Sequence, residues 1–126
     1  MKNKLFLIWF FVSINAYANS NWVYVIKDVP GNINFIDNKS IQKSGDSITF
    51  WVRTNFIERD KFGDLSTKIQ NTINCRTREI IGRHYMFYDD LNNTGKLTLN
   101  TGSTNEKWTP IAPDTVNWGM YTHVCK

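Results

Sequence analysis

Ser47-Ile-Thr-Phe-Trp-Val-Arg-Thr-Asn55 is the stretch that decides the fold. Apolar side chains recur in it at every second position, at Ile48, Phe50 and Val52. Successive side chains of a β-strand point to opposite faces, so this alternation predicts a half-buried strand with those three residues in the core. Trp51 then lies on the opposite face, which is either covered by a second layer or exposed for contact with a partner.

The segments before this stretch predict a hairpin. Residues 22–26 and 33–36 are rich in β-branched and aromatic side chains, and the turn-forming run Val29-Pro-Gly-Asn32 lies between them. A second turn, Lys43-Ser-Gly-Asp46, leads into the central strand.

Residues 67–75, which follow a polar loop, alternate again and predict another strand. Cys75 falls on its core face together with Ile69 and Ile73. Polar side chains such as Thr72 fall on the other face, which we expect to meet solvent.

The next segments predict a second hairpin. Residues 78–88 form a longer and less regular strand in which Gly82 marks a bulge. The turn-forming run 90–95 then leads into a strand around residues 97–99.

The period changes near the C-terminus. Val116, Met120 and Val124 recur every four residues, which is typical of one face of an α-helix. Pro113 can open this helix, and the carboxylate of Asp114 would accept hydrogen bonds from its first N–H groups. We therefore predict the α+β class, with a small antiparallel sheet of about five to six strands and a C-terminal helix packed on one face.

The first 18 residues are expected to be an export signal. Lys2 and Lys4 supply a positive start, residues 5–14 an apolar run, and Ala16-Tyr-Ala18 a cleavage site. The apolar run is too short for a membrane-spanning helix, which needs roughly 20 residues. We predict a signal peptide at 1–18 and one domain at 19–126. No cysteine near the junction could carry a lipid, so we expect no membrane anchor after cleavage and a location in the periplasm, in the medium or at the cell surface.

Cys75 and Cys125 are the only two cysteines. An oxidising compartment favours their pairing, so we predict one disulfide that joins the helix to the sheet. A catalytic or redox role would need an adjacent activating histidine or a C-x-x-C spacing, and the sequence has neither.

The charge balance argues against nucleic-acid binding. Without Lys2 and Lys4, 13 basic residues remain against 11 acidic ones, a net charge of +2, whereas nucleic-acid-binding domains usually carry a strongly basic stripe. Basic residues are in local excess between Arg53 and Arg83. They either bind an acidic protein surface or a polyanion, or form an ordinary solvated face. The candidate partner-binding residues are Arg59, Lys61, Lys68, Arg76 and Arg78.

No pattern in the sequence points to catalysis, a cofactor or a metal ion. His84 and His123 have no second ligand at a zinc-like interval, and no nucleotide-binding or serine-nucleophile motif occurs. Residues 90–95 are similar to the start of a calcium loop, but Thr101 stands where that loop needs a bidentate carboxylate. We therefore expect neither an enzyme nor a cofactor.

Several short motifs occur in order along the chain after the export signal. They are Phe35-Ile-Asp37, Ser40-Ile41, Gly45-Asp-Ser-Ile-Thr-Phe-Trp-Val52, Asn74-Cys-Arg76, Trp108-Thr-Pro-Ile-Ala-Pro113 and Val124-Cys125. Their order resembles the surface-adhesin protein E family over nearly the whole mature chain. The resemblance implies a small antiparallel sheet with a packed helix, exported by a Gram-negative bacterium. It also supports pairing of the two cysteines.

The resemblance leaves two functions to consider. The first is an exported protein-binding module, similar to the adhesins of this family that bind host matrix and plasma proteins. The second is a periplasmic accessory protein that supports envelope assembly or inhibits an enzyme, because Ala16-Tyr-Ala18 stands where lipid-anchored members have a cysteine. A protein partner is expected in the first case. A covered second face of the sheet would instead indicate a homodimer or a closed barrel.

Overall fold

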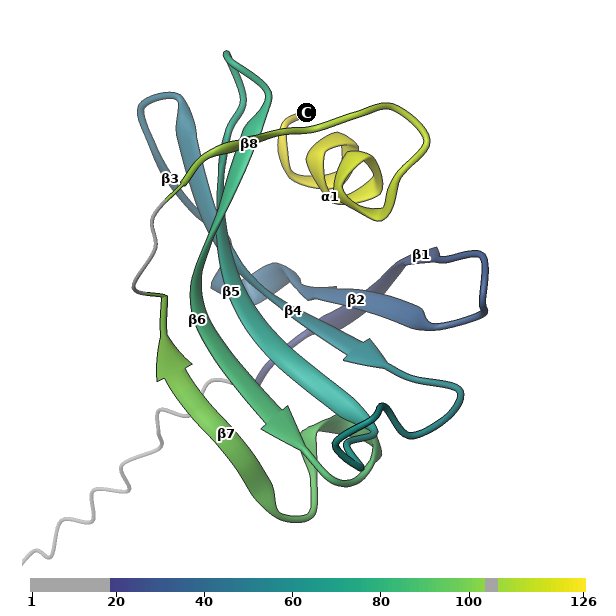
Figure 1. Cartoon of the computed structure of the whole chain (residues 1–126). Coiled ribbons are helices and arrows are strands. Elements are labelled where there is room, and N and C mark those ends of the chain that lie inside the picture. The colour runs from purple at the N-terminus through teal and green to yellow at the C-terminus, as the bar shows by residue number, and fades with distance from the viewer. Residues whose placement is uncertain (1–18, 104–106) are drawn as a thin grey trace, which may run out of the picture.

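One antiparallel sheet forms the body of the domain (Figure 1). The computed structural model describes residues 19–103 and 107–126, so the predicted signal peptide lies outside the described residues. Neighbouring strands follow the order β1-β2-β4-β5-β6-β7, and the short β3 and β8 pair with β4 and β6. The strands are β1 Trp22–Lys27, β2 Ile33–Asp37, β3 Gln42–Ser44, β4 Ser47–Asn55, β5 Ser66–Asn74, β6 Glu79–Tyr88, β7 Leu97–Gly102 and β8 Thr109–Pro110.

The alternation in β4 is confirmed and defines the two faces of the sheet. Ile48, Phe50 and Val52 are each at most 5% exposed. They lie on the inner face, where Ile73 of β5 opposes Ile48 in the antiparallel register. Ile36 of β2 opposes Val52 on the same face. The side chains on the other side, the outer face, include Trp51.

Helix α1, Val116–Val124, packs on the inner face, on the concave side of the curved sheet (Figure 1). Met120 and Val124 are buried with the sheet residues of the core, and Val116 packs against that core. Cys75, at the end of β5, is bonded to Cys125, with the two sulfur atoms 2.03 Å apart. The predicted α+β architecture, helical face and disulfide are therefore confirmed.

The start of α1 differs from the prediction. Thr115 is the capping residue, because it has extended backbone angles and its Oγ1 accepts a hydrogen bond from the backbone N–H of Trp118 at 3.2 Å. Asp114 has a φ of +63°. A capping residue needs an extended conformation, so Asp114 cannot fill this position from the left-handed one.

The hairpins occur where the turn residues predicted them. Strands β1 and β2 pair around residues 28–32, and β6 and β7 pair across the turn at 90–95. The predicted turn at 43–46 also occurs, between β3 and β4. The β5–β6 register shifts beside Gly82, which confirms the bulge. The ring of Tyr85 covers Gly82 on the inner face, where an added Cβ would overlap the Tyr85 hydroxyl. The short strands β3 and β8 and the single-turn helices η1 (Asn38–Ser40) and η2 (Leu91–Asn93) were not predicted.

Thr72 corrects the prediction that the polar face of β5 meets solvent along its length. It lies on the outer face but is only 4% exposed. Its hydroxyl is 2.8 Å from that of Thr49 and accepts a hydrogen bond from Nε of Arg83 at 3.2 Å. The outer face is thus partly covered by its own long side chains.

Candidate functional site

The outer face of the sheet carries rings and cations side by side on its central strands. Five half-buried residues form what we call the outer-face cluster: Trp22, Trp51, Arg53, Lys68 and His84. They come from β1, β4, β5 and β6, and the strand register places them together, because Arg53 opposes Lys68 and Gln70 lies between Trp51 and His84.

Trp51 lies at the centre of the outer-face cluster. Nζ of Lys68 is 5.1 Å from the centre of its ring, within the range of a cation–π contact. The imidazole of His84 meets the same ring edge to face, with the ring centres 6.1 Å apart. Nε2 of His84 is 2.6 Å from Oδ1 of Asn100 on β7. Trp51 is half-buried, and Lys68 and His84 both contact its ring.

Arg53 is the most tightly held cation of the outer-face cluster. Its guanidinium lies 4.3 Å above the ring of Trp22, and its Nε donates to Oδ1 of Asn93 at 3.0 Å. Burial lowers the pKa of Arg53 from its ordinary value, and the negative charge of Asp37 opposes this shift. Arg53 stays protonated in all ordinary conditions, so this site holds a fixed positive charge.

Two further contacts extend the same chemistry over the outer face. The guanidinium of Arg83 lies 5.8 Å from the ring centre of Trp108. On β1 and β2, Tyr24 and Phe35 form an edge-to-face pair with ring centres 6.5 Å apart, and Tyr24 is 56% exposed. Phe35 directly opposes Arg53 in the register of β2 and β4. An apolar aromatic area therefore borders the charged cluster.

The five candidate partner-binding residues from the sequence do not form one patch. Lys68 belongs to the outer-face cluster. Arg59 and Lys61 lie in the loop between β4 and β5, where Nη1 of Arg59 donates to the carbonyl oxygens of Gly63 and Asp89 at 2.9 and 2.7 Å.

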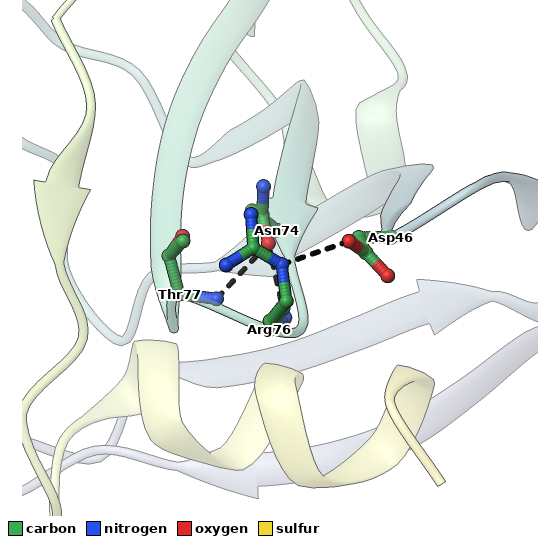
Figure 2. A network of polar contacts seen from close by, with 4 residues as sticks. All are labelled: Asp46, Asn74, Arg76 and Thr77. Atoms are coloured by element: carbon green, nitrogen blue, oxygen red, sulfur yellow. Dashed lines mark hydrogen bonds and ion pairs between the residues drawn. The ribbon is translucent and has the colours of Figure 1, made fainter.

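Arg76 and Arg78 lie at the opposite end of β5, in the β5–β6 turn. Figure 2 shows Nε of Arg76 paired with Oδ2 of Asp46 at 3.0 Å, and Oδ1 of Asn74 accepting from the backbone N–H groups of Arg76 and Thr77. The Arg76 side chain is 71% exposed. A 9-residue strand separates this turn from Arg59 and Lys61, so a single small ligand cannot bridge them.

Sequence reasoning included Arg53 and Arg83 in the basic excess but not among the candidate residues, and it did not connect Trp22 with either. The alternation of side chains along β4 was the signal in the sequence that could have found Arg53, because it places Trp51 and Arg53 on the same face. The partners on β1 and β6 could not be found without the strand order.

The remaining polar motifs serve the fold. Asp90 caps η2 by accepting from the backbone N–H of Leu91 at 2.8 Å, and Asp89 accepts from that of Lys96 at 2.7 Å. Nε2 of His123 is 2.7 Å from Oδ1 of Asn38, which ties α1 to η1. Over residues 19–103 and 107–126, no three His, Cys, Asp or Glu side chains gather in a geometry suited to a metal ion.

Open hollows also lie away from the outer-face cluster. One, of about 370 Å³, is mostly apolar and is lined by Phe62, Asp64, Phe87, Thr98 and Leu99. Another, of about 250 Å³, lies beside the disulfide. No described helix has the length and apolar character to cross a bilayer.

Comparison with known proteins agrees with this architecture. The sequence model described as "Surface-adhesin protein E" matches residues 22–126. None of the curated proteins compared with the chain matches it.

Solved structures of protein E from Haemophilus influenzae share the fold. Crystal form II aligns with a TM-score of 0.61 at 18% identity and covers 90% of this chain and 94% of that chain. The selenomethionine form aligns with a TM-score of 0.60 at 18% identity, with 90% and 92% covered. Protein E from a non-typeable strain gives 0.58 at 17% identity, with 90% and 81% covered.

Proposed function

This chain belongs to the surface-adhesin protein E family, and from that premise we propose that it is an exported protein-binding module that acts outside the cell or at its surface. Its partners on this proposal are matrix or plasma proteins of a host. The family match, which spans residues 22–126, is the observation that carries the proposal. The family is one of surface adhesins, so the proposed function is binding.

Three features of the chain support an exported binding module. The first 18 residues carry the charge, apolar run and small-residue site of a cleavable signal. Cys75 and Cys125 are joined in a disulfide, which forms in oxidising compartments such as the periplasm or the exterior. The outer face presents tryptophan and arginine, the residue types that dominate binding energy at protein interfaces.

A second candidate is a periplasmic accessory or inhibitor protein. The sequence at the expected processing site favours it, because Asn19 and not a cysteine follows Ala18. Both cysteines of the chain are in the disulfide, so neither thiol is available for a lipid.

Protease access on intact cells separates the two candidates. On our proposal, external protease removes the protein from intact cells, or the mature protein is found in the medium, while a known periplasmic protein stays intact. Protection until the outer membrane is opened would support the periplasmic candidate instead.

Binding to immobilised host matrix and plasma proteins tests the finer part of the proposal. Purified mature protein should bind at least one of them saturably and not bind an albumin-coated surface. Protein exposed on cells that binds none of them would keep the location and overturn the host partner.

A further inference from the structure

Arg53 and Lys68 lie directly opposite each other on two neighbouring central strands, on the same face of the sheet. They are register partners on β4 and β5, and like charges in this position destabilise a sheet. Each cation is held over a different ring, Arg53 over Trp22 and Lys68 over Trp51. A pair of like charges lowers stability, yet here two aromatic rings hold it in place. Such a local cost in stability is characteristic of a functional site.

The chemistry of this pair suits a carboxylate. A carboxylate between the two cations would remove their repulsion and accept charge-assisted hydrogen bonds from both. Stacking on a ring orients the planar guanidinium, so less conformational entropy is lost when it binds. The nearby acidic residue, Asp37, is already engaged, since its Oδ1 accepts from the backbone N–H groups of Asn21 and Lys39 at 2.7 and 3.0 Å.

The surroundings of the pair fit a protein segment better than a polyanionic sugar. Phe35 directly neighbours Arg53, and the exposed ring of Tyr24 packs on Phe35. This apolar aromatic area would stay unmatched against a chain of charged sugars but would be covered by apolar side chains of a protein.

We propose that the outer-face cluster docks an acidic segment of a partner protein, with Asp or Glu carboxylates on Arg53 and Lys68 and apolar side chains on the neighbouring Tyr24 and Phe35. This inference rests on the proposed function and names its binding face and the chemistry of its partner.

A pair of synthetic peptides tests the chemistry on the mature protein. In one, Glu alternates with Ser around a central Phe, and in the other Gln replaces every Glu. NMR titration should shift the indole N–H resonances of Trp22 and Trp51, leave that of Trp118 on α1 in place, and show this only with the Glu peptide. Raising the salt from about 0.01 to 0.1 M shortens the screening length from roughly 30 to 10 Å and should weaken the binding.

Two double variants with the same change of charge test the location. Arg53→Gln with Lys68→Gln should weaken binding of the Glu peptide by about tenfold or more. Arg76→Gln with Arg78→Gln removes two positive charges from the exposed β5–β6 turn and should leave the affinity within about twofold. The exchange Arg53→Lys with Lys68→Arg keeps both charges and should retain salt-dependent binding, which guards against loss by misfolding.

Three results would overturn the inference. Equal weakening by the two Gln double variants would mean that net charge and not the outer-face cluster binds the peptide. Shifts confined to Trp118 would place the site on α1. A heparin fragment that binds through Arg53 and Lys68 while the Glu peptide does not would make the ligand an acidic sugar.

The same variants separate this inference from the proposed function. If a host protein binds equally to wild type and to the Arg53→Gln, Lys68→Gln variant, the outer-face inference fails and the adhesin function stands. If the Glu peptide binds the cluster but no host protein binds the mature protein, the site stands and the proposed host function fails.

Discussion

Gly119 is the residue at which α1 comes close to β1. An added Cβ at this position would lie 2.9 Å from Cδ1 and 3.2 Å from Cβ of Ile26. Alanine would gain up to about 1 kcal/mol of helix propensity, but overpacking typically costs about 1–3 kcal/mol. We expect Gly119→Ala to lower the free energy of unfolding by about 1 kcal/mol in urea titrations. The cost should shrink in an Ile26→Ala background, and a gain in the wild-type background would contradict the close contact.

His123 gives the stability a defined dependence on pH. Burial lowers the pKa of His123 from its ordinary value of 6.5, and the positive charge of Lys126 acts in the same direction. As the pH falls, His123 is therefore protonated in the unfolded chain before it is protonated in the folded chain. The contribution of neutral His123 to the stability of the fold is complete above pH 6.5 and is lost as the pH falls through the folded-state pKa.

We expect the melting temperature of wild type to fall more than that of His123→Gln between about pH 7 and pH 5. Glutamine keeps an N–H donor for Asn38 but does not titrate. Subtracting the two profiles removes the groups that they share. A difference that is flat with pH, or that grows in the opposite direction, would contradict the shift.

The burial of single residues was predictable where apolar side chains recur at the period of a strand or a helix. The alternation of β4 identified Ile48, Phe50 and Val52 as core residues, and the period of four identified Met120 and Val124. Thr72 and Asp114 were assigned wrongly, because the cover supplied by Arg83 and the left-handed backbone at 114 depend on residues distant in the sequence or on turn geometry.

At the scale of elements, the disulfide holds α1 to the end of β5. It closes a loop of 50 positions, for which the chain-entropy estimate is about 4 kcal/mol. Replacing both cysteines by serine should lower the free energy of unfolding by about 3–5 kcal/mol. Hydrogen exchange should quicken most at the amides of α1, while β4 and β5 keep more protection. Equal loss of protection throughout would mean that helix and sheet do not separate.

The β5–β6 turn should tolerate the loss of its charges. The ion pair between Arg76 and Asp46 joins side chains that are 71% and 58% exposed, and exposed pairs contribute about 0–1 kcal/mol. The variant Arg76→Gln with Arg78→Gln should melt within about 5 °C of wild type by circular dichroism. A larger fall would give these arginines a structural role and disqualify the variant as a binding control.

Elements were predictable where turn residues and a clear period coincide, as in the hairpins at 28–32 and 90–95. The 2-residue strand β8 and the 3-residue strand β3 are too short to show a period, so only the structure reveals them. The outer-face cluster was predicted only in part for a related reason. Its residues are brought together only by the order of the strands in the sheet, in which β2 lies between β1 and the central strand β4. Local sequence patterns do not reveal that order.

At the scale of the whole molecule, the predicted processing site makes a direct test possible. Signal peptidase requires small residues at the two alanine positions of Ala16-Tyr-Ala18. Ala18→Gln should leave the precursor uncut, whereas Ala18→Ser should be processed, and mass spectrometry of the wild type should find Asn19 at the new N-terminus. Cleavage elsewhere, or none in wild type, would change the domain boundary.

The described sheet is open, since its order runs from β1 to β7 and these two strands do not pair in the described part of the chain. Sequence reasoning left a closed barrel as one explanation for Trp51, and the strand order removes it. The ring of Trp51 is instead contacted by Lys68 and His84 of the same sheet.

The order of the strands also governs how quickly the domain can assemble. Most neighbours in the sheet are consecutive along the chain, and such local pairings need only short loops to close, which favours rapid zippering from hairpin to hairpin. The docking of α1 against the sheet must instead close a long loop, because Cys75 and Cys125 are 50 positions apart in the sequence. In an oxidised chain the disulfide already holds the two ends of this segment together, so the oxidised chain should refold faster than the reduced chain.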